Sequence, residues 1–274
     1  MYSGSTLTNK SGAVLGAHQK IDRVAHKYFS AITNDAEGFP ELKDIIHFEG
    51  KNGPDGIKRK SPAIDEPWHF YDPFDVTDTK LLVILNEHYT ELVKQLKKKA
   101  PERASFDAAW LAHALVDGLT PAHHFPYEEK LAELRGKDMS DRNSIKNKAI
   151  IPGDTKKELI KNNWAMWGSG GLMSMHAMFE GGVAIILAPL SMKTAKPSTA
   201  DIELMITIGY EEYFKRAARE IALLDMYDRF HEKGWSTKLV RDVRNELGPI
   251  IMKTVCLVWF SAMRDAGLLK SKKK

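Results

Sequence analysis

Apolar residues recur every three or four positions through most of the chain, and this spacing is typical of amphipathic α-helices. The segment 14–32 shows it with Ile21, Val24 and Phe29, and the segment 74–99 repeats it with a series of leucines. No segment of four to eight residues alternates apolar and polar side chains convincingly, as a half-buried β-strand would. The pattern predicts an all-α protein of about six to eight helices.

Further helices and their boundaries follow from the same spacing. Ser105 and Ser236 are predicted N-caps, because a serine hydroxyl can accept a backbone N–H of the first turn. Pro249 predicts a kink or a break in the last helix. Glycine, proline and charged residues make 35–73 and 127–154 the predicted loops. The remaining predicted helices are 106–119, 171–190, 201–230 and 236–266.

Chain length and cysteine content limit the architecture and the kind of metal site. At about 150 residues per domain, a chain of 274 residues makes one large or two small domains. No internal repeat is visible, so we expect one multi-helix domain over 1–269. The sequence holds one cysteine, Cys256, which excludes an intramolecular disulfide framework and a cysteine-rich zinc finger. Any metal must then be held by Asp, Glu and the ten histidines.

Charge and hydropathy argue against a duplex DNA reader and against a membrane-spanning protein. The formal net charge is +4, and four lysines lie in the basic tail 270–274, which we expect to be disordered. The segment 1–10 is polar and lacks the apolar core of a signal peptide. The longest apolar run, 181–190, has ten residues, whereas a spanning helix needs about 20. We therefore expect a cytoplasmic protein, or one secreted after other processing or by another route.

The segment 113–123 carries the most specific chemical pattern. His113 and Asp117 are four residues apart on a predicted helix, so both side chains point to one face. Pro121 then bends the chain, because its ring would clash with a helical carbonyl, and the bend can return His123 to that face. Imidazole and carboxylate groups together make a good zinc site. His124, one residue further on, is the alternative to His123.

Three other histidines are candidates with weaker local signals. His176 and Glu180 share a helix face, although such a pair is often an ordinary surface ion pair. His69 lies in the aromatic string 67–73, where a packed loop histidine is the simpler reading. His18 begins the first predicted helix, where its ring can also be satisfied by the backbone.

In this order, the four pieces resemble the zinc-dependent phospholipase C family and the related fungal zinc nucleases. The hallmark of that superfamily, His-x-x-x-Asp-x-x-x-Pro-x-His, matches 113–123 at every anchor. The string His-Phe-Tyr-Asp-Pro of the phospholipase branch matches 69–73, and His-x-x-x-Glu matches 176–180. The resemblance implies an all-α fold that holds three zinc ions in a cleft, which we expect the segment 127–154 to roof.

The resemblance also implies how the ligands divide between the ions. The first zinc would take His69, His113 and Asp117, together with an upstream aspartate. Asp55 is our choice for that aspartate, and Asp44 is the alternative.

The other two sites follow from the remaining matches. The second zinc would take His123, His176 and Glu180. The third would take His18, with Asp117 bridging to the first. The family completes this third site with the amine and carbonyl of an N-terminal Trp, and no Trp precedes Trp68 here. The third site is therefore the one that this sequence does not complete.

The function that the resemblance implies is hydrolysis of a phosphodiester by a zinc-activated hydroxide. Asp55 and Asp117 would be the catalytic carboxylates, and Asp22 and Asp72 are candidates to orient the imidazoles. The string 69–73 favours a phospholipase C acting on phospholipid at a transiently bound membrane. The alternatives are a nuclease or 3′-nucleotidase acting on single strands or nucleotides, and a non-catalytic zinc-binding helical protein.

Two tryptophans lie between the hallmark and the downstream pair. We expect Trp164 and Trp167 to pack in the core, the alternative being that they flank a base or an acyl chain.

Overall fold

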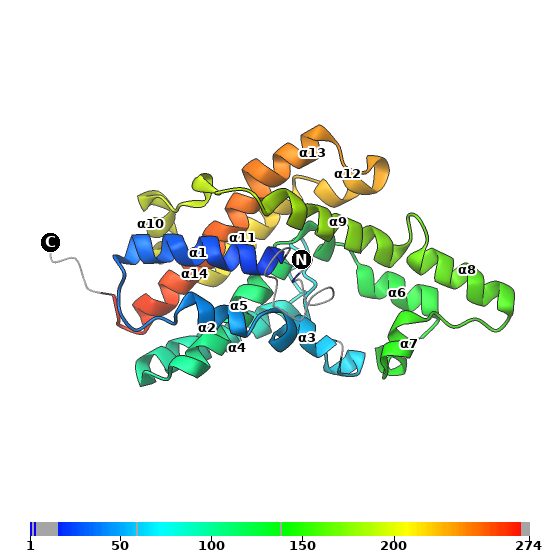
Figure 1. The fold of residues 1–274 in the computed structure, drawn as a ribbon, viewed down its shortest axis with the longest axis horizontal. Coiled ribbons are helices and arrows are strands. Elements are labelled where there is room, and N and C mark those ends of the chain that lie inside the picture. The colour runs from blue at the N-terminus through cyan, green and yellow to red at the C-terminus, as the bar shows by residue number, and fades with distance from the viewer. Residues whose placement is uncertain (2, 4–15, 59, 138, 270–274) are drawn as a thin grey trace.

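A computed structural model describes residues 1, 3, 16–58, 60–137 and 139–269 (Figure 1). These residues form fourteen α-helices and no β-strand, which confirms the all-α fold. The helices outnumber the expected count because both predicted loops contain short helices, an unpredicted helix covers 156–167, and the predicted helix 201–230 is divided. The basic tail 270–274 and the predicted helix start at Val14 lie outside the described residues.

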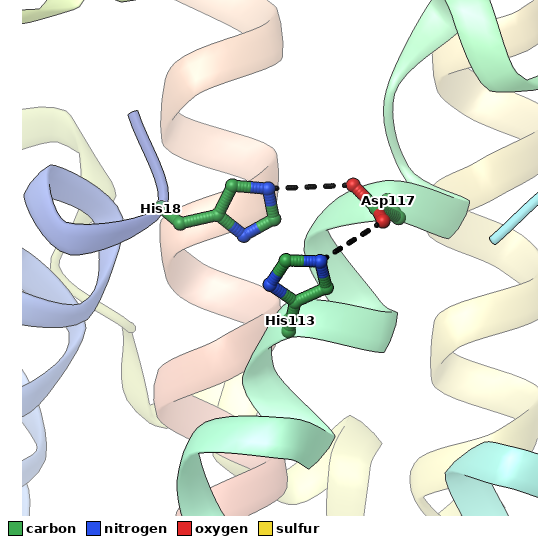
Figure 2. Close-up of side chains that lie close together, drawn as sticks. All are labelled: His18, His113 and Asp117. Atoms are coloured by element: carbon green, nitrogen blue, oxygen red, sulfur yellow. Dashed lines mark ion pairs between the residues drawn. The ribbon is translucent and has the colours of Figure 1, made fainter. Parts of the chain in front are cut away.

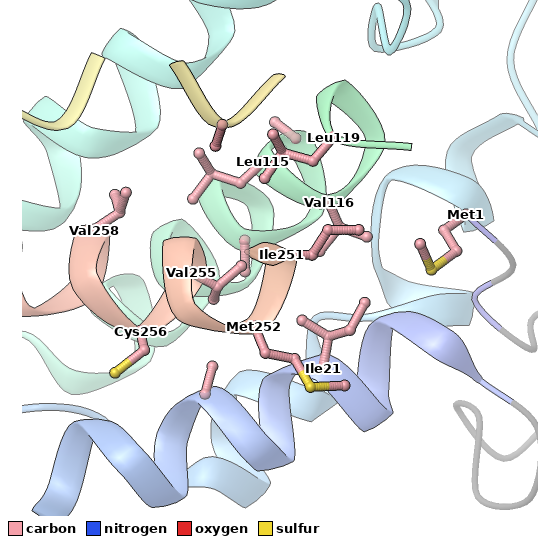
Figure 3. Close-up of a cluster of buried hydrophobic side chains, with 14 of the residues drawn as sticks. Met1, Ile21, Leu115, Val116, Leu119, Ile251, Met252, Val255, Cys256 and Val258 are labelled. Atoms are coloured by element: carbon pink, nitrogen blue, oxygen red, sulfur yellow. The ribbon is translucent and has the colours of Figure 1, made fainter. Parts of the chain in front are cut away.

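Four long helices form the body of the molecule: α1 (Ala17–Thr33), α4 (Lys80–Lys98), α5 (Pro101–Gly118) and α14 (Gly248–Asp265). α4 packs along α5, and α1 packs along α14, which also contacts α5. Figure 3 shows where they meet, with Ile21, Leu115 and Ile251 in one shared apolar core. Burial of this apolar surface is the main force that holds the four helices together.

The start of α5 differs from the prediction, whereas its end agrees with it. Ser105 is not an N-cap, because α5 begins at Pro101 and the Ser105 hydroxyl donates to the Pro101 carbonyl. Proline suits a first turn, since its missing N–H has no partner there. α5 ends at Gly118, where a Cβ atom would lie 2.4 Å from Leu81 and 2.6 Å from Phe214. Only glycine permits this close approach beside Asp117.

The predicted helix 201–230 is three helices in the structure: α10 (Thr199–Ile208), α11 (Tyr210–Ala222) and α12 (Met226–Lys233). Gly209 has a φ of 79° and Asp225 a φ of 52°, and neither value fits an α-helix. The apolar spacing continues across both breaks, so the spacing alone does not reveal them.

The last long helix is capped and interrupted as the sequence predicts. The Ser236 hydroxyl accepts the Leu239 backbone N–H and so caps α13 (Thr237–Asp242). A π-helical turn, Val243–Leu247, then precedes α14, in which Pro249 lies in the first turn. This turn is the predicted irregularity at Pro249.

A lobe at one end of the molecule covers α9 (Leu172–Leu187) (Figure 1). It consists of α6 (Tyr127–Arg135), α7 (Ile145–Ala149) and α8 (Lys156–Trp167), none of which was predicted, because 127–154 was expected to be a loop. A second, small core holds the lobe, with buried Phe70, Tyr127, Leu131, Ile151 and Met166. Elsewhere, short elements connect the long helices: α2 (Leu42–His47), Gly50–Asn52, α3 (Pro54–Lys58), Ala63–Asp65, Pro121–His123, Met139–Asp141 and Lys193–Ala195.

Two helical stretches are long and apolar enough to cross a membrane by length and composition, a test that core helices of soluble proteins also pass. Thr237–Asp265 belongs to the core, because 78% of its most apolar window is buried. Lys156–Leu187 differs, since only 33% of its window is buried. The second stretch therefore carries apolar side chains that the fold leaves outside.

Candidate metal centre

One group of three candidate ligands lies between α1 and α5. His18, His113 and Asp117 place ligand atoms within 4.8 Å of one another, and all three residues are buried (Figure 2). Asp117 uses both oxygens, since Oδ1 lies 3.3 Å from His18 Nε2 and Oδ2 lies 3.3 Å from His113 Nε2. The two imidazole rings stack with their centroids 4.0 Å apart.

These distances suit two ligands of one zinc ion. Ligands at about 2.0–2.1 Å from a tetrahedral zinc lie roughly 3.3 Å from each other. His113 Nε2 and Asp117 Oδ2 are buried and have no hydrogen-bond partner among the described residues. They form an ion pair with each other when His113 is protonated, and a shared cation would bind both atoms when it is not.

A second group joins the 3₁₀ turn Pro121–His123 to α9. His123, His176 and Glu180 also place ligand atoms within 4.8 Å of one another. Glu180 Oε1 lies 2.8 Å from His123 Nε2 and 3.1 Å from His176 Nε2. Asp117 Oδ1 lies 3.6 Å from His123 Nδ1, so Asp117 connects the two groups.

His69 and Asp55 belong to neither group of three but lie beside them. His69 lines a small cavity of about 10 Å³ together with His113 and Asp117, and a single water or ion needs about this volume. Asp55 Oδ1 lies 3.8 Å from His113 Nε2 and is paired with Lys58 at 2.7 Å. The alternative, Asp44, is exposed on α2 and is not at the centre.

His123, rather than His124, belongs to the centre. The His124 ring points elsewhere, with Nε2 2.9 Å from the Gly118 carbonyl oxygen. His123 Nδ1 lies 2.9 Å from the His69 carbonyl oxygen, which leaves its Nε2 directed at Glu180. The backbone carbonyl thus orients this imidazole.

Glu49 is a member of the site that sequence reasoning missed. It is fully buried, and both of its carboxylate oxygens lie 3.2 Å from His113 Nδ1. A carboxylate on one imidazole nitrogen directs the other nitrogen toward a metal. The residues expected in this role do not fill it: Asp72 is exposed and accepts the Phe74 backbone N–H, and both Asp22 oxygens lack a hydrogen-bond partner within the described residues.

The backbone of Met1 reaches the same cluster. Its α-ammonium lies 2.6 Å from Asp117 Oδ1 and 3.1 Å from Glu180 Oε1. Its carbonyl oxygen lies 2.7 Å from His18 Nε2. A positive charge therefore lies between the carboxylates of the two groups.

The electrostatics of the carboxylates indicate a site that attracts cations. Burial alone would raise the pKa of Asp117, but the Met1 ammonium and the neighbouring histidines hold that pKa well below its usual range. Burial is likewise outweighed at Glu180, whose pKa the Met1 ammonium and His176 lower strongly. Both carboxylates are therefore ionised at neutral pH and are ready to bind a cation.

The two buried imidazoles differ in charge. At His113, burial would lower the pKa, but the Glu49 and Asp117 carboxylates raise it to about 10. At His123, burial and then the Met1 ammonium lower the pKa to about 4. A zinc ion can bind His123 without displacing a proton, whereas it must displace one from His113.

A cleft of about 730 Å³ opens beside the centre, between the lobe and α9. Asp55, His69, His176 and Glu180 line it at the centre. The segment 127–154, expected to roof the cleft, contributes wall residues from helices as well as loops. The apolar part of the wall includes Leu131, Met166, Trp167, Met173, Ala184 and Ile185.

Comparisons with known proteins do not extend these findings: the chain matches no family model, no curated protein and no solved structure.

Proposed function

We propose that the protein is a zinc-dependent phosphoester hydrolase of the phospholipase C type. The observation that supports this most directly is the convergence of His18, His113 and Asp117, three buried residues whose ligand atoms lie within 4.8 Å of one another. Zinc held by such ligands supplies hydroxide at neutral pH and neutralises charge on phosphoryl oxygens. The protein's own part is to hold the ions at the wall of an open cleft.

The ligands would divide into the sets that the geometry favours. His18, His113 and Asp117 would hold one ion, and the set of His123, His176 and Glu180 would hold another. A metal ion would replace the proton on His113 and leave Glu49 as the acceptor of its Nδ1–H.

His69 and Asp55 complete the edge of the centre that faces the cleft. Lys58 holds Asp55 and also lines the cleft, so one residue both fixes a catalytic carboxylate and offers a positive charge to a phosphate.

The third zinc set implied by the resemblance needs a main-chain amine and carbonyl beside His18. We propose that Met1 provides both, when its α-amine is unblocked, to the ion that His18, His113 and Asp117 would hold, in the role that an N-terminal Trp has in the family. Two additional residues placed before Met1 convert the amine to an amide. Metal analysis of that extended chain should then show one zinc fewer than the unextended chain.

The apolar wall of the cleft supports a phospholipid as substrate. Leu131, Met166 and Ile185 offer a surface for acyl chains. The basic wall residues Arg142 and Lys148 are paired with Glu128 and Glu66, so they do not form an unpaired positive track for a nucleic acid strand.

Metal content and turnover test the proposal together. Purified protein should contain at least two zinc ions and hydrolyse bis(p-nitrophenyl) phosphate, and a chelator should abolish turnover until zinc is restored. Asp117→Asn should lose turnover and more than one zinc, whereas Asp44→Asn, an exposed aspartate outside the centre, should retain both. One tightly held zinc without turnover would instead identify a non-catalytic zinc protein.

Paired substrates then separate the two branches. Release of phosphocholine from phosphatidylcholine supports the phospholipase assignment, and release of nucleoside from a 3′-nucleotide supports the nuclease alternative.

A further inference from the structure

Helix α8 presents an apolar face to the outside of the lobe. Ile160, Trp164 and Trp167 are 70%, 68% and 47% exposed, respectively, and lie at the spacing i, i+4, i+7 of one helix face. We call these three residues the α8 face. On another side of the helix, Met166 is buried in the second core. The helix is therefore anchored by one side and exposes an apolar surface on another, contrary to the expectation that both tryptophans pack in the core.

Positive charges flank the α8 face. Lys156, Lys157 and Lys161 are all exposed, and a rotation of about 100° per residue places them along its edges. They make no ion pair within the part of the chain that the structure describes. Glu158 is the one acid in α8, and it is engaged in the capping box with Thr155. Basic and aromatic residues around an apolar face characterise helices that lie in the interface of a membrane.

The connection to α9 favours a helix that lies on a bilayer over one that crosses it. The stretch Lys156–Leu187 passes a length and composition test for a span. However, α8 ends at Trp167 and α9 begins at Leu172, and Gly170 between them has a φ of 83°. Beyond that break, α9 carries two candidate metal ligands, so it cannot lie in hydrocarbon while it serves the centre.

The α8 face is continuous with the wall of the cleft. Trp167 belongs to both, and its indole N–H donates to the Ala149 carbonyl at 2.7 Å, which fixes the ring at the cleft wall. Ile185, which is exposed on α9, lines the same cleft. A bilayer in contact with the α8 face would therefore meet the apolar part of the cleft.

We propose that the α8 face docks the protein on the surface of bilayers that contain anionic lipid. Ile160 and Trp164 enter the boundary between head groups and acyl chains, and the three lysines contact the negative head groups. The docking itself does not depend on the proposed function. Only its purpose, the presentation of a lipid phosphodiester to the cleft, rests on that function.

Vesicle co-sedimentation tests the docking without any catalysis. Wild-type protein without metal should bind vesicles of phosphatidylcholine with about 30 mol % phosphatidylserine, and more weakly those of phosphatidylcholine alone. Ile160→Ser and Trp164→Ser should each weaken binding about tenfold. Each Lys→Gln change at Lys156, Lys157 or Lys161 should cost about fivefold on the anionic vesicles. Leu223→Ser, at a comparably exposed apolar residue in the turn after α11, is the matched control and should bind as the wild type does.

The outcomes separate docking from hydrolysis. Loss of vesicle binding in Trp164→Ser, with unchanged turnover of bis(p-nitrophenyl) phosphate and an unchanged thermal midpoint, supports the proposal. Vesicle binding without any turnover would leave docking in place and remove the hydrolase assignment. Equal binding of Trp164→Ser, Leu223→Ser and wild type would overturn docking. A dimer seen by light scattering that Trp164→Ser dissociates, with no vesicle binding, would also overturn it.

Discussion

His113 Nδ1 lies 3.2 Å from both carboxylate oxygens of Glu49, a residue 64 positions earlier in the chain. The buried carboxylate accepts the Nδ1–H and so fixes which nitrogen faces Asp117. The contact explains how a histidine in the middle of a buried helix keeps one ring orientation without a metal bound.

Glu49→Gln should weaken zinc binding by about 10- to 100-fold, because an amide is a poorer acceptor for the His113 N–H than a carboxylate. Competition with a chromogenic zinc chelator measures the change. Glu37→Gln alters an exposed glutamate far from the centre and is the matched control. An unchanged zinc affinity in Glu49→Gln would show that Glu49 does not support the site.

His123→Asn and His124→Asn should differ in metal content although the residues are adjacent. His123 Nε2 lies 2.8 Å from Glu180, so its loss should remove at least one zinc per chain. His124 Nε2 contacts the Gly118 carbonyl, so its loss should lower stability and leave the zinc content unchanged. Metal analysis by mass spectrometry after gel filtration decides between the two, and the reverse pattern would move the ligand to His124.

The metal-free protein should be most stable near neutral pH. The pKa of His113 is raised to about 10. Its contribution to the free energy of unfolding is therefore complete below about pH 6.5 and is lost as the pH rises through 10. The pKa of His123 is lowered to about 4. Its contribution to the free energy of unfolding is therefore present above about pH 6.5 and is lost as the pH falls through 4. Urea unfolding midpoints between pH 4 and 10, measured with a chelator present, test both limbs.

A variant assigns the alkaline limb of that profile. His113→Gln should make the loss of stability above pH 7 shallower, whereas His231→Gln, at an exposed position, should leave it as it is in the wild type. A profile that is equally steep in both variants would mean that other groups cause the loss.

Two adjacent glycines of α9 should respond oppositely to alanine. A Cβ on Gly182 would lie 2.2 Å from the Trp235 ring, and Phe179 stacks on that ring. Gly182→Ala should therefore lower the free energy of unfolding by about 1–3 kcal/mol. A Cβ on Gly181 would meet nothing within 4 Å, so Gly181→Ala should raise it by about 0.5–1 kcal/mol. Denaturant unfolding of the two variants tests the difference in sign.

The parts of the site that the sequence predicted are those fixed by local geometry. His113 and Asp117 share a face because they are four apart on one helix, and the same holds for His176 and Glu180. The turn at Pro121 is local too, and it does bring His123 back toward Asp117. Spacing along the chain sufficed for each of these contacts.

The missed parts depend on tertiary packing. Glu49 lies in a predicted loop, and no periodic signal marks it as buried. Lys58 pairs with Asp55 one helical turn away, yet only the fold shows that both face the cleft. For α8, a local signal did exist, since Thr155 and Glu158 form a capping box. The exposure of Trp164 was not predictable, because an aromatic residue at helical spacing is usually buried.

The modest size of the second core has a dynamic consequence. The second core holds the lobe with five buried side chains, whereas the main core contains many more, from several long helices. Segments with few apolar contacts open locally at a lower free energy than the whole protein unfolds. The lobe should therefore open locally while the helices of the body stay folded. Amide hydrogens of α7 and α8 should then exchange well before those of α14. Such local opening would widen the entrance of the cleft for a bulky lipid and leave the buried histidines in place.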